Sequence, residues 1–298
     1  MNRIREGYLF VQNPFNAHKH SRVDLSSHQV DSIVFWTKNA RPILQYLDEL
    51  DQKGYKYYFQ FTLTGYPKSI EPSVPSIDAS LSTFKDLSKK LGAERVIWRF
   101  DPIIISDISK EDFILRTFEK IAKQLHNYTK RVVISFADFY KKVTNNLNRL
   151  EKESNIKFYD VSCNMEQINR ISSYLSEIAH SNSMQIFSCA EKYELSQFGV
   201  KHGKCIDDDL IRKLFGIAID VQKDKFQREE CGCVQSQDIG QYNTCIHDCV
   251  YCYANFNKNM AHSQWSLHDP SSPFLLGNGN QTQMPKEKEA QLSLLKNK

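Results

Sequence analysis

Short apolar runs alternate with longer amphipathic stretches along the first 200 residues. The apolar runs are rich in Val, Ile, Phe and Tyr, and several are apolar on both faces, which is typical of buried parallel strands. They predict strands over residues 8–11, 32–36, 56–63, 95–105, 131–136 and 184–189. The stretches between them have helical periodicity and predict helices over residues 42–53, 78–91, 110–125, 141–153 and 166–180. This alternation indicates parallel βα units.

Six strands with intervening helices fit a complete or partial (β/α) barrel, or an open doubly wound sheet. Periodicity does not separate these α/β folds, and we favour the barrel or partial barrel, over residues 1–205. The pattern then changes. Residues 206–270 contain one more predicted helix, at 206–215, and a cysteine-rich stretch that we expect to bind a cluster and pack on the barrel. Residues 271–298 are polar and weakly patterned, and they predict a solvated tail.

Composition indicates a globular protein, because 18 Phe, 14 Tyr and 3 Trp supply ample apolar surface. A net charge of +4 is too small to indicate nucleic-acid binding, although it allows a local basic pocket for an anionic substrate. The sequence shows neither a signal-peptide pattern nor an apolar run of about 20 residues. We therefore expect a cytoplasmic protein without membrane contact, whose eight cysteines serve metal binding or catalysis rather than disulfides.

Three of these cysteines are closely spaced: residues 245–252 read Cys-Ile-His-Asp-Cys-Val-Tyr-Cys. This spacing allows Cys245, Cys249 and Cys252 to face one small loop. Soft thiolates select iron–sulfur clusters or zinc. A structural zinc site normally has four ligands in paired spacing. The triad therefore favours a [4Fe-4S] cluster in which one iron has no protein ligand.

The pattern C-x3-C-x-aromatic-C, with Tyr251 as its aromatic residue, resembles the signature of radical S-adenosylmethionine (SAM) enzymes. The resemblance implies that Tyr251 packs near the adenine of SAM and that the open iron chelates the amino and carboxylate groups of its methionine part. It also implies that an external electron donor reduces the cluster and that SAM is cleaved to methionine and a 5′-deoxyadenosyl radical, which abstracts hydrogen from a substrate. His247 is expected to be a bystander.

The motif stands near the end of the chain, whereas radical SAM enzymes usually carry it after the first barrel strand. The barrel must therefore precede it, in a permuted arrangement. The sequence resembles a bacterial family of unknown function over about residues 1–275. Members usually begin with a further strand-like segment rich in Ser, Arg and Asp. Its absence before Met1 predicts an incomplete barrel. The resemblance rests on the phrases NPFN (13–16), VDSIVFWTKN (30–39), YYFQFTLTGY (57–66), RVIWRFDPI (95–103) and CGCVQSQDIGQYNTCIHDCVYCYAN (231–255).

Four further cysteines, Cys189, Cys205, Cys231 and Cys233, are scattered along the sequence. Together they offer enough thiolates for an auxiliary [4Fe-4S] cluster or a zinc ion. The alternative is that they are buried as small hydrophobic side chains. Cys163 is left over and is expected to be structural.

Two cations stand near the expected C-terminal ends of strands, where βα barrels bind ligands. Lys38 and Arg99 are suited to bind the carboxylate of SAM, because a buried cation needs an anionic partner. The alternative is an internal ion pair, formed by Arg99 with Asp101 or Glu191.

Uncharged polar residues lie in the same regions of the sequence. Gln60 and Thr62 occupy one predicted strand, and we expect them to contact the ribose of SAM or the substrate. Asn255 follows the triad, and we expect it to hydrogen-bond nearby backbone or SAM.

These patterns favour a radical SAM enzyme acting on a small molecule, a peptide or a nucleic acid, with nucleic-acid repair like that of spore photoproduct lyase as one subclass. A zinc- or cluster-stabilised binding protein without radical chemistry is the second hypothesis. A metal-independent βα enzyme with Glu191 or Asp101 as general base is the third, and it leaves the cysteines unexplained.

Overall fold

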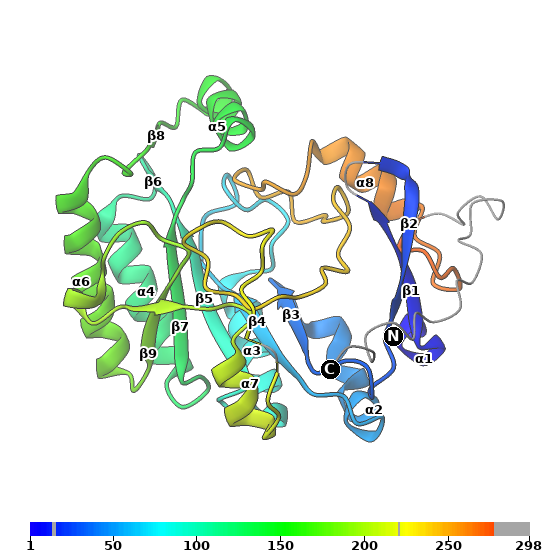
Figure 1. Ribbon diagram of the computed structural model, residues 1–298. Helices are drawn as coiled ribbons and strands as arrows, with labels where there is room; N and C mark the ends of the chain where they lie inside the picture. The colour runs from blue at the N-terminus through cyan, green and yellow to red at the C-terminus, as the bar shows by residue number, and fades with distance from the viewer. Residues whose placement is uncertain (14–15, 220, 277–298) are drawn as a thin grey trace. The chain divides into compact units, whose positions relative to one another are not determined.

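The computed structural model describes residues 1–13, 16–219 and 221–276 (Figure 1). Its contacts divide the chain into two compact units. The larger unit holds residues 31–237 and 247–253, and the smaller holds 1–30, 238–246 and the described residues from 254 onward. These units are interleaved along the sequence, whereas the pattern predicted consecutive regions. The predicted tail lies, from residue 277 on, outside the described residues.

The larger unit is an α/β structure built on one six-stranded sheet in which every neighbouring pair is parallel, as predicted. A closed barrel, one of the folds that periodicity allowed, is not found in the described residues. Among the described residues, the two outermost strands each pair with one neighbour only, so the sheet has two edges. Its strands, in spatial order, are β10 (Lys201–Gly203), β9 (Gln185–Cys189), β7 (Arg131–Phe136), β5 (Val96–Ile103), β4 (Tyr57–Thr62) and β3 (Ile33–Thr37).

One face of this sheet carries an aromatic layer that packs against helices. Trp98 of β5 stacks on Phe118 with 4.6 Å between ring centroids, and Phe61 of β4 lies 5.2 Å from Phe84. These side chains are wholly buried, which stabilises the fold because aromatic rings remove large apolar areas from water. The covering helices are α3 (Ile77–Leu91), α4 (Glu111–Leu125) and α6 (Met165–Ser181).

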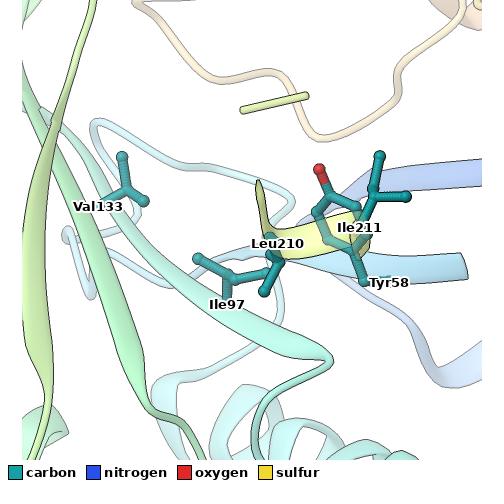
Figure 2. Packing of buried hydrophobic residues seen from close by; sticks show 5 residues of the cluster. All are labelled: Tyr58, Ile97, Val133, Leu210 and Ile211. Carbon is teal, nitrogen blue, oxygen red and sulfur yellow. The ribbon is translucent and has the colours of Figure 1, made fainter. Parts of the chain in front are cut away.

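The opposite face changes character along the strands. Near the strand starts it is apolar, and α7 (Asp208–Phe215) covers it with Leu210 and Ile211 (Figure 2). Side chains two positions apart share a face in a strand. The next row toward the C-terminal strand ends is therefore on the same face, and it is polar: Gln60, Arg99, Ser135 and Cys189.

Several shorter elements complete the larger unit. The predicted helix over 42–53 is divided between a 3-10 helix, η1 (Arg41–Tyr46), and α2 (Leu47–Gln52), with Pro42 in the first turn. The others are β6 (Ile105–Ser106), which pairs antiparallel with β8 (Phe158–Tyr159), together with α5 (Lys141–Ser154) and η2 (Ser196–Phe198).

One prediction about the smaller unit was wrong: the strand expected over 8–11 does not belong to the parallel sheet. It is β1 (Tyr8–Asn13), which forms an antiparallel hairpin with β2 (Asn16–Asp24). Residues 16–24 contain few apolar residues, so β2 gave no strand signal and its pairing was missed. The unit also contains α1 (Asn2–Glu6) and α8 (Lys258–Ser266). None of the helices in the described part of the chain has the length and apolar character of a membrane span.

Candidate metal and cofactor site

The second and third cysteines of the motif lie in one turn of the larger unit. We call residues 247–253 the motif loop. Within it, the backbone N–H of Cys252 donates to the carbonyl oxygen of Cys249 at 3.1 Å. Asp248 has a left-handed φ of 59°, which turns the chain between the first and second cysteines. Cys249 and Cys252 are half-buried, whereas Cys245 is exposed and belongs to the smaller unit.

The motif loop is hydrogen-bonded to the segment that follows β4. Ser73 N–H donates to the His247 carbonyl at 3.1 Å, and Val250 N–H donates to the Ile70 carbonyl at 3.1 Å. The Ser73 hydroxyl donates to Asp248 at 3.1 Å. The His247 ring also meets the Ser73 carbonyl through Nδ1, at 3.3 Å, and burial lowers the pKa of this imidazole. The loop is therefore fixed by its own backbone as well as by side chains.

Tyr251, the aromatic residue of the motif, also anchors the loop to this segment. Its hydroxyl donates to Glu71, and its ring packs edge-on against Tyr66 with 6.4 Å between centroids. Burial, followed by the charge of Glu71, holds the pKa of Tyr251 well above its usual range, so the hydroxyl remains a donor at neutral pH. The contact with adenine that the sequence predicts remains a prediction.

Glu71 is the residue that sequence reasoning missed. Its side chain is 3% exposed and accepts hydrogen bonds from Lys38 at 2.9 Å and Thr64 at 2.6 Å, in addition to Tyr251. Lys38, which was expected to bind a SAM carboxylate, is thus paired internally, and its ammonium lies 5.6 Å from the centre of the Tyr251 ring. Glu71 stands among turn residues with no periodic pattern, so no sequence signal identified it.

A cavity of about 170 Å³ adjoins this cluster, and Thr62, Thr64 and Glu71 line part of its wall. Pockets that hold drug-sized ligands usually have volumes of about 300–1,000 Å³. The cavity therefore places Thr62 beside a small hollow and does not by itself outline a SAM pocket.

A second cation, besides Lys38, contacts the last residue of the motif loop. Lys142, in the first turn of α5, donates to the Tyr253 carbonyl at 2.8 Å. Burial lowers the pKa of Lys142, and the negative charge of a Cys252 thiolate opposes that shift. Lys142 therefore places a positive charge beside the end of the motif loop.

Within the smaller unit, Asn255 holds the backbone around Cys245. Its Nδ2 donates to the Cys245 carbonyl oxygen at 2.6 Å. This is the hydrogen bond to nearby backbone that the sequence suggested as one of two alternatives. The Asn255 side chain is buried, and its Oδ1 has no hydrogen-bond partner among the described residues. A buried acceptor without a partner is costly, which makes this oxygen a candidate contact for a bound ligand.

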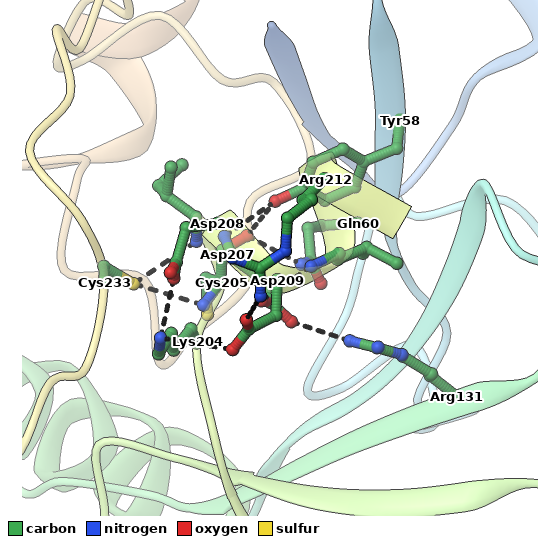
Figure 3. Close-up of polar contacts among 12 residues, drawn as sticks. Tyr58, Gln60, Arg131, Lys204, Cys205, Asp207, Asp208, Asp209, Arg212 and Cys233 are labelled. Atoms are coloured by element: carbon green, nitrogen blue, oxygen red, sulfur yellow. Dashed lines mark hydrogen bonds and ion pairs between the residues drawn. The ribbon is translucent and has the colours of Figure 1, made fainter. Parts of the chain in front are cut away.

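Arg99 and Gln60 both contact Cys205, away from the motif loop, and Figure 3 shows Gln60 beside Cys205. Arg99 forms the internal ion pair with Asp101, Nε to Oδ2 at 2.9 Å, and its Nη1 donates to the Cys205 sulfur at 2.8 Å. Burial alone would lower the pKa of Arg99, but Asp101 and the nearby cysteines hold it well above its usual range. Gln60 Nε2 and the Tyr58 hydroxyl donate to the Cys205 carbonyl, at 3.0 and 2.6 Å.

Three consecutive carboxylates at the start of α7 also appear in Figure 3, with ligand oxygens within 4.8 Å of one another. Asp207 caps the helix through Leu210 N–H at 3.0 Å. Each carboxylate faces a cation, so the group has a structural explanation as a capped and neutralised helix start. The ion pairs join Asp207 to Arg131, Asp208 to Lys204, and Asp209 to Lys204 and Arg212.

The four scattered cysteines meet in the larger unit. We call Cys189, Cys205, Cys231 and Cys233 the four-cysteine group; the last three are buried and pack with Ala190, and Cys189 lies against them. Cys163 is exposed and lies outside this group. All eight cysteines lie within the described residues, and none is in a disulfide.

Comparison with known proteins gives a family. A family model described as a domain of unknown function, DUF1848, matches residues 1–254 and so includes Cys245, Cys249 and Cys252. Searches of curated proteins and of solved structures find no match. Because this family model matches most of the sequence, the chain belongs to DUF1848, a family of domains of unknown function.

Proposed function

We propose that this protein is a radical SAM enzyme whose [4Fe-4S] cluster is held by Cys245, Cys249 and Cys252. The observation that carries the proposal is the C-x3-C-x-Tyr-C sequence together with the hydrogen-bonded turn that joins Cys249 to Cys252. Residues 70–73, which fix this turn, follow β4. Ligand sites of parallel α/β folds lie at the C-terminal ends of strands, where such segments begin.

The residues present fit a cluster with one open iron. Three soft thiolates supply one ligand to each of three irons, with Cys245 joining the other two by its place in the motif. The four-cysteine group is a separate constellation, so it offers no fourth ligand to the motif. Lys142 contributes a positive charge beside the motif loop, where the thiolate ligands of a bound cluster would be negative.

A cluster held by Cys245, Cys249 and Cys252 would supply one-electron reduction of SAM with electrons from an external donor, giving methionine and a 5′-deoxyadenosyl radical that would abstract hydrogen from a substrate. The chain's own residues hold and orient this chemistry. Tyr251 and Glu71 keep the motif loop in place, and Lys38 neutralises Glu71 so that the buried carboxylate is paired. The unpartnered Asn255 Oδ1 is suited to accept a hydrogen bond from the ammonium group of SAM.

The sheet is consistent with a partial (β/α) barrel in this proposal. Its strands are all parallel, and α3, α4 and α6 cover one face as outer helices do. The other face corresponds to a barrel interior that is apolar near the strand starts and polar near the strand ends.

The proposal is tested by SAM cleavage. The protein is reconstituted anaerobically with iron and sulfide, reduced with dithionite and given SAM, and 5′-deoxyadenosine is measured by mass spectrometry. We expect product from the wild type and from Cys163→Ala, which removes an exposed cysteine, but not from Cys249→Ala. Absence of product from a wild-type protein that retains stoichiometric zinc would contradict the proposal and indicate a zinc-stabilised binding protein.

A further inference from the structure

The four-cysteine group draws thiols from three separate segments to one end of the sheet. Cys189 ends β9, Cys205 follows β10, and the other two cysteines come from the chain after α7. Gly203 pairs with Cys189 in the parallel register, so the residues after β10 pass the end of β9. As a result, the Cys189 and Cys205 sulfurs are 3.2 Å apart. Nothing in the sequence spacing indicates this convergence.

Glycines permit the close approach. A Cβ at Gly203 would come within 2.6 Å of the Ser188 carbonyl oxygen, a contact that the backbone cannot relieve by a rotamer change. Gly232 separates the last two cysteines and lies near Lys204, whose Cγ would be 3.2 Å from a Cβ there. The chain is therefore shaped to let the cysteine-bearing segments touch.

Hydrogen-bond donors are aimed at the sulfurs of this group. The backbone N–H groups of Cys205 and Ile206 donate to the Cys233 sulfur at 3.1 and 3.4 Å. Arg99 Nη1 donates to the Cys205 sulfur at 2.8 Å. A neutral thiol is only a weak acceptor, whereas thiolates bound to metals are regularly supported by such donors.

The buried guanidinium distinguishes this group from an ordinary apolar cluster. Arg99 is 5% exposed, and Asp101 accepts from its Nε and Nη2 atoms. Its Nη1 atom lies 2.8 Å from the Cys205 sulfur and 3.4 Å from Gln60 Oε1, so the sulfur receives the shorter of these two contacts. A thiolate matches this charged donor better than a neutral thiol, which is only a weak acceptor. Four thiolates around a metal centre carry a negative charge that Arg99 would balance.

From these contacts we propose that Cys189, Cys205, Cys231 and Cys233 bind a second metal centre through four thiolates. The ligand class is a thiophilic metal, either one zinc ion or an iron–sulfur cluster. Ligation of a zinc ion or of an assembled cluster forms four metal–sulfur bonds and releases the thiol protons to solvent, and this ligation step involves no redox change. This site is independent of the proposed SAM chemistry.

The test removes the motif and asks what metal remains. The full chain carrying Cys245→Ala, Cys249→Ala and Cys252→Ala is purified anaerobically and reconstituted either with iron and sulfide or with zinc. Metal is measured by mass spectrometry and sulfide by a colorimetric assay. We expect about four irons with about four sulfides per chain, or about one zinc. A chain that retains no metal under either condition overturns the proposal, whatever the outcome of the SAM-cleavage experiment.

A second measurement uses wild-type protein, so it does not depend on whether a variant folds. Cysteines are alkylated in the native protein before and after metal removal by a chelator, and their peptides are quantified. We expect Cys205 and Cys233 to react at least about tenfold faster after metal removal, while the exposed Cys163 reacts rapidly in both states. Equal reactivity before and after chelation, or a Cys189–Cys205 disulfide in anaerobically purified protein, overturns the proposal.

Discussion

The motif loop and the four-cysteine group bring cysteines together by different means. In the motif loop, one turn carries Cys249 and Cys252, and the supporting residues bind its backbone and its aromatic side chain. In the four-cysteine group, three distant segments deliver the four sulfurs, and the supporting donors point at the sulfurs themselves. The cluster proposed at the motif would leave one iron open to SAM, whereas the four-cysteine group buries three of its four thiols. The difference is the one expected between a reactive centre at the motif and a closed one at the four-cysteine group.

The largest effect is expected from removing the carboxylate that supports the motif loop. Glu71→Ala leaves Lys38, Thr64 and Tyr251 without their shared acceptor. Breaking a buried ion pair from one side costs about 3–5 kcal/mol, so the free energy of unfolding should fall by that amount. Chemical denaturation measures it, and SAM cleavage should fall with it. Glu71→Gln keeps an acceptor oxygen and should lose less. Equal losses in the two variants would contradict this account of Glu71.

A second substitution addresses the four-cysteine group alone. Arg99→Met removes the donor to the Cys205 sulfur and keeps a long apolar side chain. Loss of a group that supports a metal ligand typically lowers metal affinity 10–100-fold, and we expect a reduction of about that size in chelator competition. Arg95→Met, which removes a cation at the start of the same strand, is the control. Unchanged metal affinity in Arg99→Met would show that Arg99 does not support the ligand.

A smaller effect is expected from a substitution where β9 and β10 approach closely. Gly203→Ala forces a Cβ against the Ser188 carbonyl, and such overpacking costs about 1–3 kcal/mol. We expect a lower melting temperature and weaker metal retention at the four-cysteine group. Gly232→Ala is the matched control, because the tightest contact of its new Cβ is with the flexible Lys204 side chain, at 3.2 Å, and the nearest backbone atom is at an ordinary 3.7 Å. A Gly232→Ala protein as impaired as Gly203→Ala would contradict this explanation.

The smallest expected loss of stability comes from breaking an ion pair outside both cysteine regions. Arg170 binds Glu111 through two hydrogen bonds, of 2.7 and 2.8 Å, and its side chain holds the pKa of Glu111 below the usual value. A carboxyl whose folded-state pKa is lowered contributes stability above its unfolded pKa and loses it as pH falls through the folded value. Arg170→Met should therefore lower the melting temperature slightly at pH 7 and by less in acid.

The matched control for that substitution is Arg116→Met, which removes an exposed ion pair with Asp112 on α4. It should change stability less, because both partners are largely in solvent. Neither variant should alter the metal content of either cysteine region. A pH-independent loss in Arg170→Met would show that packing, rather than the charge of Glu111, explains its effect.

The sequence predicted the elements that have a strong local pattern. The strand over 131–136 has the predicted bounds, and the helices over 78–91 and 110–125 differ from α3 and α4 by one residue at the start. The β1–β2 hairpin was missed because its second strand is polar. The choice between a barrel and an open sheet was left open, because periodicity carries no information about closure.

The site residues also divide into those placed by local spacing and those placed by long-range contacts. Cys249 and Cys252 are three residues apart, so their shared turn is a local property that spacing reveals. Glu71 acts through contacts with residues 33 positions before it and 180 positions after it, and no local pattern encodes those contacts. The same holds for Arg99 and Cys205, which are 106 positions apart.

The most direct measurement of the central claim is the electron paramagnetic resonance spectrum of the reduced protein, with and without SAM, in the wild type and in Cys249→Ala. An open iron in the motif predicts a [4Fe-4S]⁺ signal in the wild type that changes when SAM binds, and no such change in the variant. A wild-type spectrum that SAM leaves unaltered, or a SAM-dependent change that survives in Cys249→Ala, would contradict the assignment of the motif as the SAM-binding centre.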